Sequence, residues 1–156
     1  MAVTLEDISQ AAARLQGVAV KTPLLQSNVL NERLGAEVFL KPECLQHIGA
    51  FKFRGAYNRI CQLSDTEKAF GVVAYSSGNH AQGVAYAAKL LGLQATIVMP
   101  TDAPTIKKEG TEKLGAVILF YYRHSESREC FAPDIAERTG LAHFPTFASA
   151  AIIALF

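Results

Sequence analysis

The sequence has few cysteines, and they lie far apart. Cys44, Cys61 and Cys130 are odd in number and form no C-x-x-C pair, so they indicate neither a disulfide framework nor a four-cysteine zinc site. We expect them to be buried, reduced thiols, the common state of a free cysteine. Cys44 and His47 are three residues apart, but no further ligands are spaced to complete a zinc site. No metal is predicted.

Long apolar runs and an excess of charge are also lacking. The longest apolar stretches, such as 95–100 and 116–122, are much shorter than the roughly 20 residues that cross a bilayer. Residues 1–10 carry acids where a secretory signal has a basic flank. The 15 Lys and Arg are balanced by 14 Asp and Glu, so no long-range field attracts nucleic acid or an anionic membrane. We expect a cytoplasmic protein with no nucleic-acid or membrane partner.

The 156 residues are half apolar and 19% charged, a composition typical of a globular chain. From residue 72 onward, apolar runs alternate with helical patterns. The expected strands are 72–75, 95–99, 116–120 and a weak 142–144, and the expected helices are 79–91, 104–114 and 126–138. Before them we expect a helix capped by Thr4 and ending near Gly17, a strand at 37–41 and a helix at 54–63.

This alternation predicts an α/β fold with parallel βαβ units. Strands that read as continuous apolar runs, such as 95–99, indicate an open parallel sheet covered by helices on both faces. Ligands of such sheets bind beyond the carboxyl ends of the strands. The turn at 76–80 lies at one of these ends.

The first candidate site residue is Lys52. It stands between Phe51 and Phe53 at the start of a predicted helix, after a Gly49-Ala50 turn that permits close backbone approach. Apolar neighbours remove water from an ammonium group, so the pKa of the lysine falls and a neutral amine becomes available as nucleophile or base. By contrast, Lys107 and Lys108 are interpreted as part of a solvated helix face.

The second candidate is the run 76–83, which follows a predicted strand and begins a helix. Backbone amides at a helix start lack partners and attract anions such as carboxylate or phosphate. Ser77 and Asn79 add short polar side chains to the same turn. The alternative is an ordinary N-cap, for which Ser and Asn are preferred. A cap accounts for one of these residues but not for the whole run of Ser, Ser, Gly, Asn, His and Gln.

Both segments, Ala-Phe-Lys-Phe-Arg-Gly-Ala at 50–56 and Ser-Ser-Gly-Asn-His-Ala-Gln at 76–82, strongly resemble the fold-type II pyridoxal-phosphate enzymes of the serine/threonine dehydratase and serine racemase group. The similarity continues through 100–104, 107–108, 115–116 and 126–129, to about Ile153. Ile48 departs from it, since many relatives have Thr there. The resemblance implies pyridoxal 5'-phosphate as cofactor and a small hydroxy-amino acid as substrate, with threonine or serine favoured over hydroxyaspartate. A dehydratase would release a 2-oxo acid and ammonia, whereas a racemase would return the proton to the opposite face.

The resemblance also implies roles for single residues. Lys52 would hold the cofactor as a Schiff base and remove the substrate Cα proton. Phe51 would pack near the cofactor ring, and Asn79 would hydrogen-bond its phenolic oxygen. Ser77, Gly78, Asn79 and His80 would bind the substrate carboxylate, and Ser77 would be the acid or base on the face opposite Lys52.

Family members run to well over 300 residues, and their glycine-rich phosphate loop would follow residue 156. Consistent with that, this sequence has no glycine after Gly140. The expected organisation is 1–55 as N-terminal arm and lysine segment of a large domain, 56–145 as small α/β domain, and 146–156 as the return to the large domain. Relatives form homo-oligomers. The alternative of another class is a non-catalytic truncated α/β fragment, because half of the cofactor site would be missing.

Overall fold

The computed structural model describes residues 3–122, 135, 137 and 140–143. Its first helix, α1 (Leu5–Leu15), starts where the sequence predicted. Thr4 accepts a hydrogen bond from the Asp7 backbone N–H, and the Asp7 carboxylate accepts one from the Thr4 N–H, which completes a capping box. None of the described helices has the length and apolar character of a membrane span.

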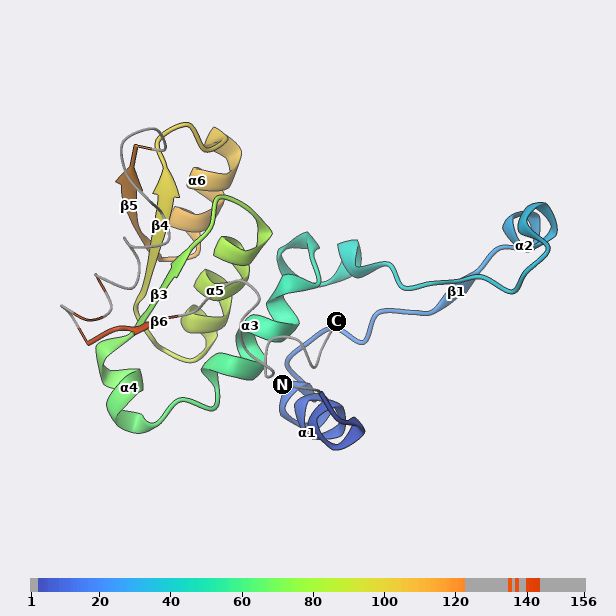
Figure 1. Ribbon diagram of the computed structural model, residues 1–156, viewed down its shortest axis with the longest axis horizontal. Helices are drawn as coiled ribbons and strands as arrows, with labels where there is room; N and C mark the ends of the chain where they lie inside the picture. Colours follow the sequence, from blue (N-terminus) through green and yellow to red (C-terminus); the bar gives the residue numbers. More distant parts are fainter. Residues whose placement is uncertain (1–2, 123–134, 136, 138–139, 144–156) are drawn as a thin grey trace.

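A narrow arm follows and projects from the body of the molecule (Figure 1). Strands β1 (Leu25–Gln26) and β2 (Phe39–Leu40) pair antiparallel, and α2 (Asn28–Leu34) connects them. The predicted strand at 37–41 is therefore only two residues long and lies outside the parallel sheet, and α2 was not predicted. All four strand residues are exposed, so burial does not impose the apolar pattern that identifies a longer strand.

The chain returns to the body through two short 3-10 turns, η1 (Glu43–Leu45) and η2 (His47–Gly49). Helix α3 (Lys52–Ile60) begins two residues earlier than the predicted helix at 54–63. Helix α4 (Asp65–Phe70), which was not predicted, is capped by Ser64 and Glu67 in a second capping box.

The predicted parallel sheet is confirmed. Its strands β3 (Val72–Tyr75), β4 (Ala95–Pro100), β5 (Val117–Tyr121) and β6 (Ala142–His143) lie in the order β5-β4-β3-β6, and every neighbouring pair is parallel. Helix α5 (Asn79–Leu90) connects β3 to β4, and α6 (Thr105–Lys113) connects β4 to β5. These bounds differ from the predicted ones by one or two residues at most.

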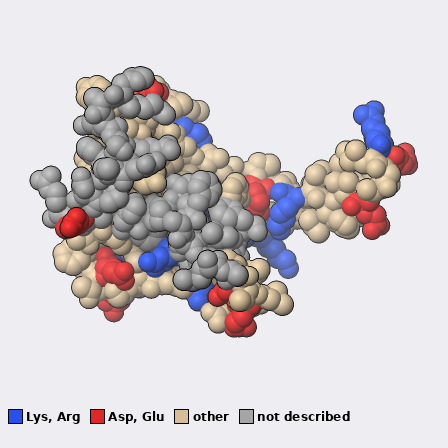
Figure 2. Space-filling view, in the orientation of Figure 1, with Lys and Arg blue, Asp and Glu red and all other residues tan. Residues whose placement is uncertain are grey.

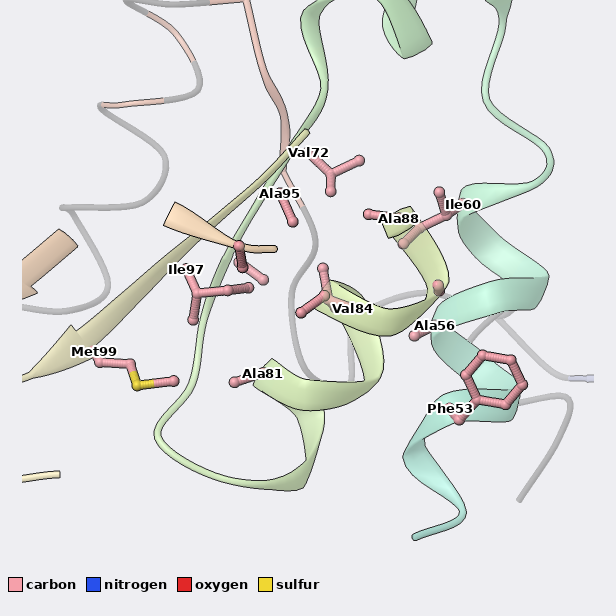
Figure 3. Packing of buried hydrophobic residues seen from close by; sticks show 14 of the residues in the cluster. Phe53, Ala56, Ile60, Val72, Ala81, Val84, Ala88, Ala95, Ile97 and Met99 are labelled. Carbon is pink, nitrogen blue, oxygen red and sulfur yellow. The ribbon is translucent and has the colours of Figure 1, made fainter. Parts of the chain in front are cut away.

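The two faces of the sheet carry different apolar clusters. Val72, Ile97 and Met99 point to the side on which α5 and α3 pack, where Phe53, Ile60 and Val84 complete the core (Figure 3). Val73, Val98 and Tyr121 point to the other side, where Ile135 and Leu141 pack against them. Ile135 and Glu137 are helical, and the rest of the predicted helix at 126–138 lies outside the described residues.

One face of the molecule carries both charges without segregation. On the face shown in Figure 2, basic and acidic side chains of the described residues are interspersed. The prediction of buried thiols is wrong for Cys44, which is exposed because it lies in the short η1 turn, and Cys61 is half-buried. Cys130 lies outside the described residues.

Candidate active site

Lys52 is the first residue of α3, and a tight turn delivers the chain to it. Ile48 and Gly49 both adopt left-handed backbone conformations, with φ of 60° and 67°. Glycine tolerates this, but a β-branched residue does so at a cost of about 1–2 kcal/mol. The strain at Ile48 is therefore located four residues before the candidate lysine, where backbone strain often marks a functional segment.

The Lys52 side chain turns inward, and its Nζ is buried. Desolvation lowers the pKa of this amine from its ordinary value of 10.5, in the direction that the apolar neighbours predicted. Nζ also lies 5.1 Å from the centroid of the Phe51 ring, a contact that favours the ammonium form and so opposes the effect of burial. Desolvation is the cause of the lowered pKa, so burial shifts Lys52 toward the neutral amine relative to an exposed lysine.

Gly83 sets the distance between Lys52 and helix α5. A Cβ at this position would lie 3.1 Å from both the carbonyl carbon and the carbonyl oxygen of Lys52, and 3.3 Å from the Phe53 nitrogen. Ordinary carbon contacts are about 3.5–4.0 Å. Only glycine therefore lets the backbone of Lys52 rest directly on the first turns of α5, a signal that the sequence analysis did not extract.

The run Ser76–His80 leaves the carboxyl end of β3 and starts α5. The N-cap residue is Gly78, and no side chain caps the helix. The Ser76 hydroxyl instead accepts a hydrogen bond from the Gly78 N–H, at 3.2 Å. The alternative of an ordinary Ser or Asn cap is therefore wrong, and amides at the start of α5 remain available to an external anion.

The predicted residues of this run are not equally accessible. Ser77 and Gly78 are half-buried, Asn79 is exposed, and His80 is buried. Because Gly83 lies one turn after Asn79 and against Lys52, the first turn of α5 and the start of α3 meet. The structure thus brings together the two predicted segments, which are more than twenty residues apart in the sequence.

Topology places this junction where parallel sheets bind ligands. Strands β3, β4 and β5 follow one another in one direction, whereas β6 lies on the opposite side of β3. The order of the sheet therefore reverses beside β3, and ligands of open α/β sheets bind at the carboxyl ends of strands at such a reversal. The 76–78 turn occupies that end of β3.

Lys107 was interpreted as solvated, and the structure corrects this. Its Nζ donates a hydrogen bond to Asn79 Oδ1 at 2.7 Å and lies 3.4 Å from Gln82 Oε1. Lys108 also has partners, since it donates to the Thr101 carbonyl oxygen at 2.7 Å and lies over the Phe120 ring. Charged residues next to each other in sequence give no sign of such contacts, because the partners come from another helix and from a loop.

The sequence analysis also missed a cluster of hydrogen-bonded side chains that connects the two ends of the arm to α3. Arg54 donates from Nε to Glu43 Oε2 at 2.7 Å and from Nη2 to Glu43 Oε1 at 2.9 Å. The Thr22 hydroxyl donates to the same carboxylate at 2.6 Å. The Arg54 guanidinium lowers the pKa of Glu43, and the Thr22 hydroxyl bond adds to this effect. This bidentate pair fixes the first turn of α3, two residues after Lys52.

A cavity of about 340 Å³ lies between η2, α5 and α6, lined by His47, Ile48, Gln82, Tyr86, Gly110 and Leu114. None of the predicted site residues lines it.

Comparison with known proteins agrees with this geometry. Residues 15–156 match the family described as "Pyridoxal-phosphate dependent enzyme". The chain is 48% identical over 141 residues to L-threo-3-hydroxyaspartate ammonia-lyase of a Pseudomonas species. The aligned residues cover 90% of this chain and 44% of that protein. It is 46% identical over 152 residues to L-threonine ammonia-lyase of Thermotoga maritima, covering 97% of this chain and 38% of that protein.

Among solved structures, maize serine racemase superposes with a TM-score of 0.92 at 39% identity, over 99% of this chain and 47% of that one. The chain thus spans less than half the length of each of these three proteins. The family match covers nearly all of the chain, and the superposition shows that the fold is that of fold-type II enzymes. The chain belongs to the pyridoxal-phosphate dependent enzyme family, whose cofactor is pyridoxal phosphate.

Proposed function

We propose that this chain carries the cofactor lysine of a pyridoxal-phosphate-dependent ammonia-lyase that converts threonine or serine to a 2-oxo acid and ammonia. The observation that carries the proposal is the packing of the Lys52 backbone against Gly83. This contact joins a buried amine of lowered pKa to the start of a helix that no side chain caps. We further propose the division into 1–55, 56–145 and 146–156 as parts of a large, a small and again the large domain.

The residues present fit the cofactor. A carbonyl compound binds a lysine covalently only through the neutral amine, which burial favours at Lys52. The Phe51 ring lies beside that amine and offers a flat apolar surface for an aromatic ring. Asn79 stands at the first position of α5 and would hydrogen-bond the phenolic oxygen of the cofactor.

When bound, pyridoxal phosphate supplies an electron sink for the pair left at the substrate Cα. The backbone amides from Ser77 to His80 would hold the substrate carboxylate, as a helix start holds anions. Lys52 Nζ would accept the Cα proton, and the Ser77 hydroxyl would hold or deliver a proton on the opposite face. Departure of the β-hydroxyl as water and hydrolysis of the C–N bond then yield the 2-oxo acid and ammonia.

Three other outcomes have support of their own. The Pseudomonas relative is a hydroxyaspartate ammonia-lyase, and the maize neighbour is a serine racemase. The third outcome is that the chain is a non-catalytic α/β fragment, since it spans less than half of each of these proteins. The reaction products distinguish these outcomes from the proposed function. Threonine gives 2-oxobutyrate, serine gives pyruvate or D-serine, and hydroxyaspartate gives oxaloacetate.

The first experiment tests whether pyridoxal phosphate attaches covalently to Lys52. The purified chain is mixed with pyridoxal phosphate, treated with borohydride, digested and examined by mass spectrometry. We expect the label on Lys52, its loss in Lys52→Ala, and its retention in Lys89→Ala, which changes an exposed lysine near the end of α5. Labelling spread over surface lysines would refute the assignment of Lys52.

A second sample of the chain with pyridoxal phosphate, neither reduced nor digested, is given L-threonine, L-serine or L-threo-3-hydroxyaspartate, and 2-oxo acid, ammonia and D-serine are measured. 2-Oxo acid and ammonia from threonine or serine would support the proposed reaction. Turnover of hydroxyaspartate alone, or D-serine alone, would replace it with one of the alternatives. Attachment at Lys52 without any product would support the non-catalytic reading.

A further inference from the structure

Lys107 reaches from one helix to the site segment of another. It lies on α6, but its Nζ donates to Asn79 Oδ1 at 2.7 Å and lies 3.4 Å from Gln82 Oε1. Asn79 and Gln82 are three residues apart on α5 and so share a face. One ammonium group therefore binds the carbonyl ends of two neighbouring amide side chains.

The position of Lys107 is fixed by its surroundings on α6. The hydroxyl of Thr111, which is fully buried, donates to the Lys107 carbonyl oxygen at 2.8 Å. A Cβ on Gly110 would overlap the amide nitrogen of Gln82, so the absence of a side chain at residue 110 leaves room for the Gln82 amide against α6. Lys107 thus lies on a turn of α6 that a buried hydroxyl stabilises, and it faces an amide for which Gly110 leaves room.

The contact determines which end of the Asn79 amide is free to donate. A carboxamide has an oxygen that only accepts and an NH₂ that only donates. With Oδ1 bound to an ammonium group, rotating the amide by 180° would place two donors against each other. Lys107 therefore keeps the Asn79 NH₂ directed away from itself, as a donor for another group.

We propose that Lys107 is a positioning residue that holds Asn79 so that its NH₂ donates to an anionic oxygen on the aromatic ring of the bound cofactor. This inference rests on the proposed function, because it needs the cofactor beside Asn79. Lys107 acts through Asn79 and does not itself touch the reacting atoms. Its positive charge also strengthens the bond to Oδ1.

The chain offers a matched control in the adjacent residue. Lys108 also donates to an oxygen at 2.7 Å, but that oxygen is the carbonyl of Thr101, away from both amides. Lys107→Met removes one charge and the bonds to both amides, and Lys108→Met removes one charge and one hydrogen bond from the same helix. Lys107→Arg keeps the charge and a donor.

The first measurement needs no cofactor. In 15N NMR spectra of the unliganded chain, the side-chain NH₂ signals of Asn79 should shift in Lys107→Met and stay in place in Lys108→Met. An unchanged Asn79 signal in Lys107→Met would overturn the contact itself.

The second measurement titrates pyridoxal phosphate and records its affinity and its absorption maximum. We expect Lys107→Met to weaken binding about fivefold, as loss of one partly exposed charge-assisted bond implies, and to shift the absorption maximum. Lys107→Arg should restore part of both, and Lys108→Met should change neither. In an Asn79→Ala background, Lys107→Met should have no further effect.

These outcomes separate the two proposals. If the wild-type chain does not attach pyridoxal phosphate at Lys52, the proposed function fails, and the cofactor role of Lys107 fails with it. If the wild-type chain binds normally but Lys107→Met binds equally well with an unshifted maximum, only the positioning role is refuted. An equal additional loss in the Asn79→Ala background would also refute it, because Lys107 would then act independently of Asn79.

Discussion

Replacing Gly83 with alanine tests whether the buried position of Lys52 depends on the absence of a side chain at residue 83. The new Cβ would lie 3.1 Å from the Lys52 carbonyl group, several tenths of an ångström inside ordinary contact. Overpacking of this kind costs about 1–3 kcal/mol, and alanine in place of glycine within a helix returns about 1 kcal/mol. We therefore expect the unfolding free energy to fall by roughly 0–2 kcal/mol, with the start of α3 displaced outward.

The displacement should affect Lys52 more than it affects stability. A misplacement of 1 Å at a reacting group costs about a hundredfold in rate, so a shift of several tenths should slow attachment of pyridoxal phosphate at Lys52 by roughly tenfold. Borohydride trapping with mass spectrometry measures the attachment, and urea unfolding measures stability.

Ala87→Gly is the matched control for this prediction. Ala87 is buried one turn later on α5, and its loss should cost about 1 kcal/mol or more in helix propensity and packing, while the rate of attachment stays unchanged. If Gly83→Ala gained the full 1 kcal/mol of helix propensity and attached the cofactor at the wild-type rate, the argument that Gly83 positions Lys52 would be refuted.

Three further predictions concern the residues around Lys52. Lys52→Met should raise the unfolding free energy of the cofactor-free chain at neutral pH, because burial penalises the ammonium form. This gain should shrink as the pH approaches 10.5, where the wild-type lysine loses its charge also when unfolded, and urea unfolding at a series of pH values would show a constant difference if the reasoning failed. Glu43→Gln should cost about 1.5–3 kcal/mol above pH 4.5, because Arg54 and Thr22 stabilise the ionised carboxylate. That cost should disappear as the pH falls through the lowered pKa of Glu43, and a loss independent of pH in thermal unfolding would contradict it. Phe53→Ala should cost about 3–5 kcal/mol, since Phe53 is fully buried against the rings of His47 and Tyr86. Phe70→Ala, at an exposed ring, should cost far less, and similar urea midpoints for the two variants would refute the assignment of Phe53 to the core.

The two central strands of the parallel sheet, β3 and β4, were predictable because they are buried on both faces. In β4 all six residues are buried, so the apolar run is continuous and visible in the sequence. Strands β1 and β2 carry no such signal, since each has two exposed residues whose pairing depends on a partner more than ten residues away. Helix α2 likewise has no buried residue, so no contact with the core fixes the spacing of its apolar residues.

The residues of the candidate site also fall into those that the sequence predicted and those that it did not. Lys52 and the run 76–80 were found because their residue types sit in unusual local surroundings, which a sequence displays directly. Gly83 and Lys107 were missed because their importance comes from contacts with another helix. A glycine within a helical pattern and a lysine on a predicted surface have ordinary explanations until the packing of α5 against α3 and α6 is known.

The two predicted segments share one feature, since each of them begins a helix. Lys52 is the first residue of α3 and Asn79 is the first residue of α5, so two helix N-termini, each with partial positive charge, face the same region. A cation at a helix start is disfavoured by about 0.3–1 kcal/mol, which adds to desolvation in favouring the neutral amine of Lys52. The same partial charges favour anions. Two helix starts joined at Gly83 therefore provide a reactive amine and an anion-binding turn together, and neither helix alone would supply both.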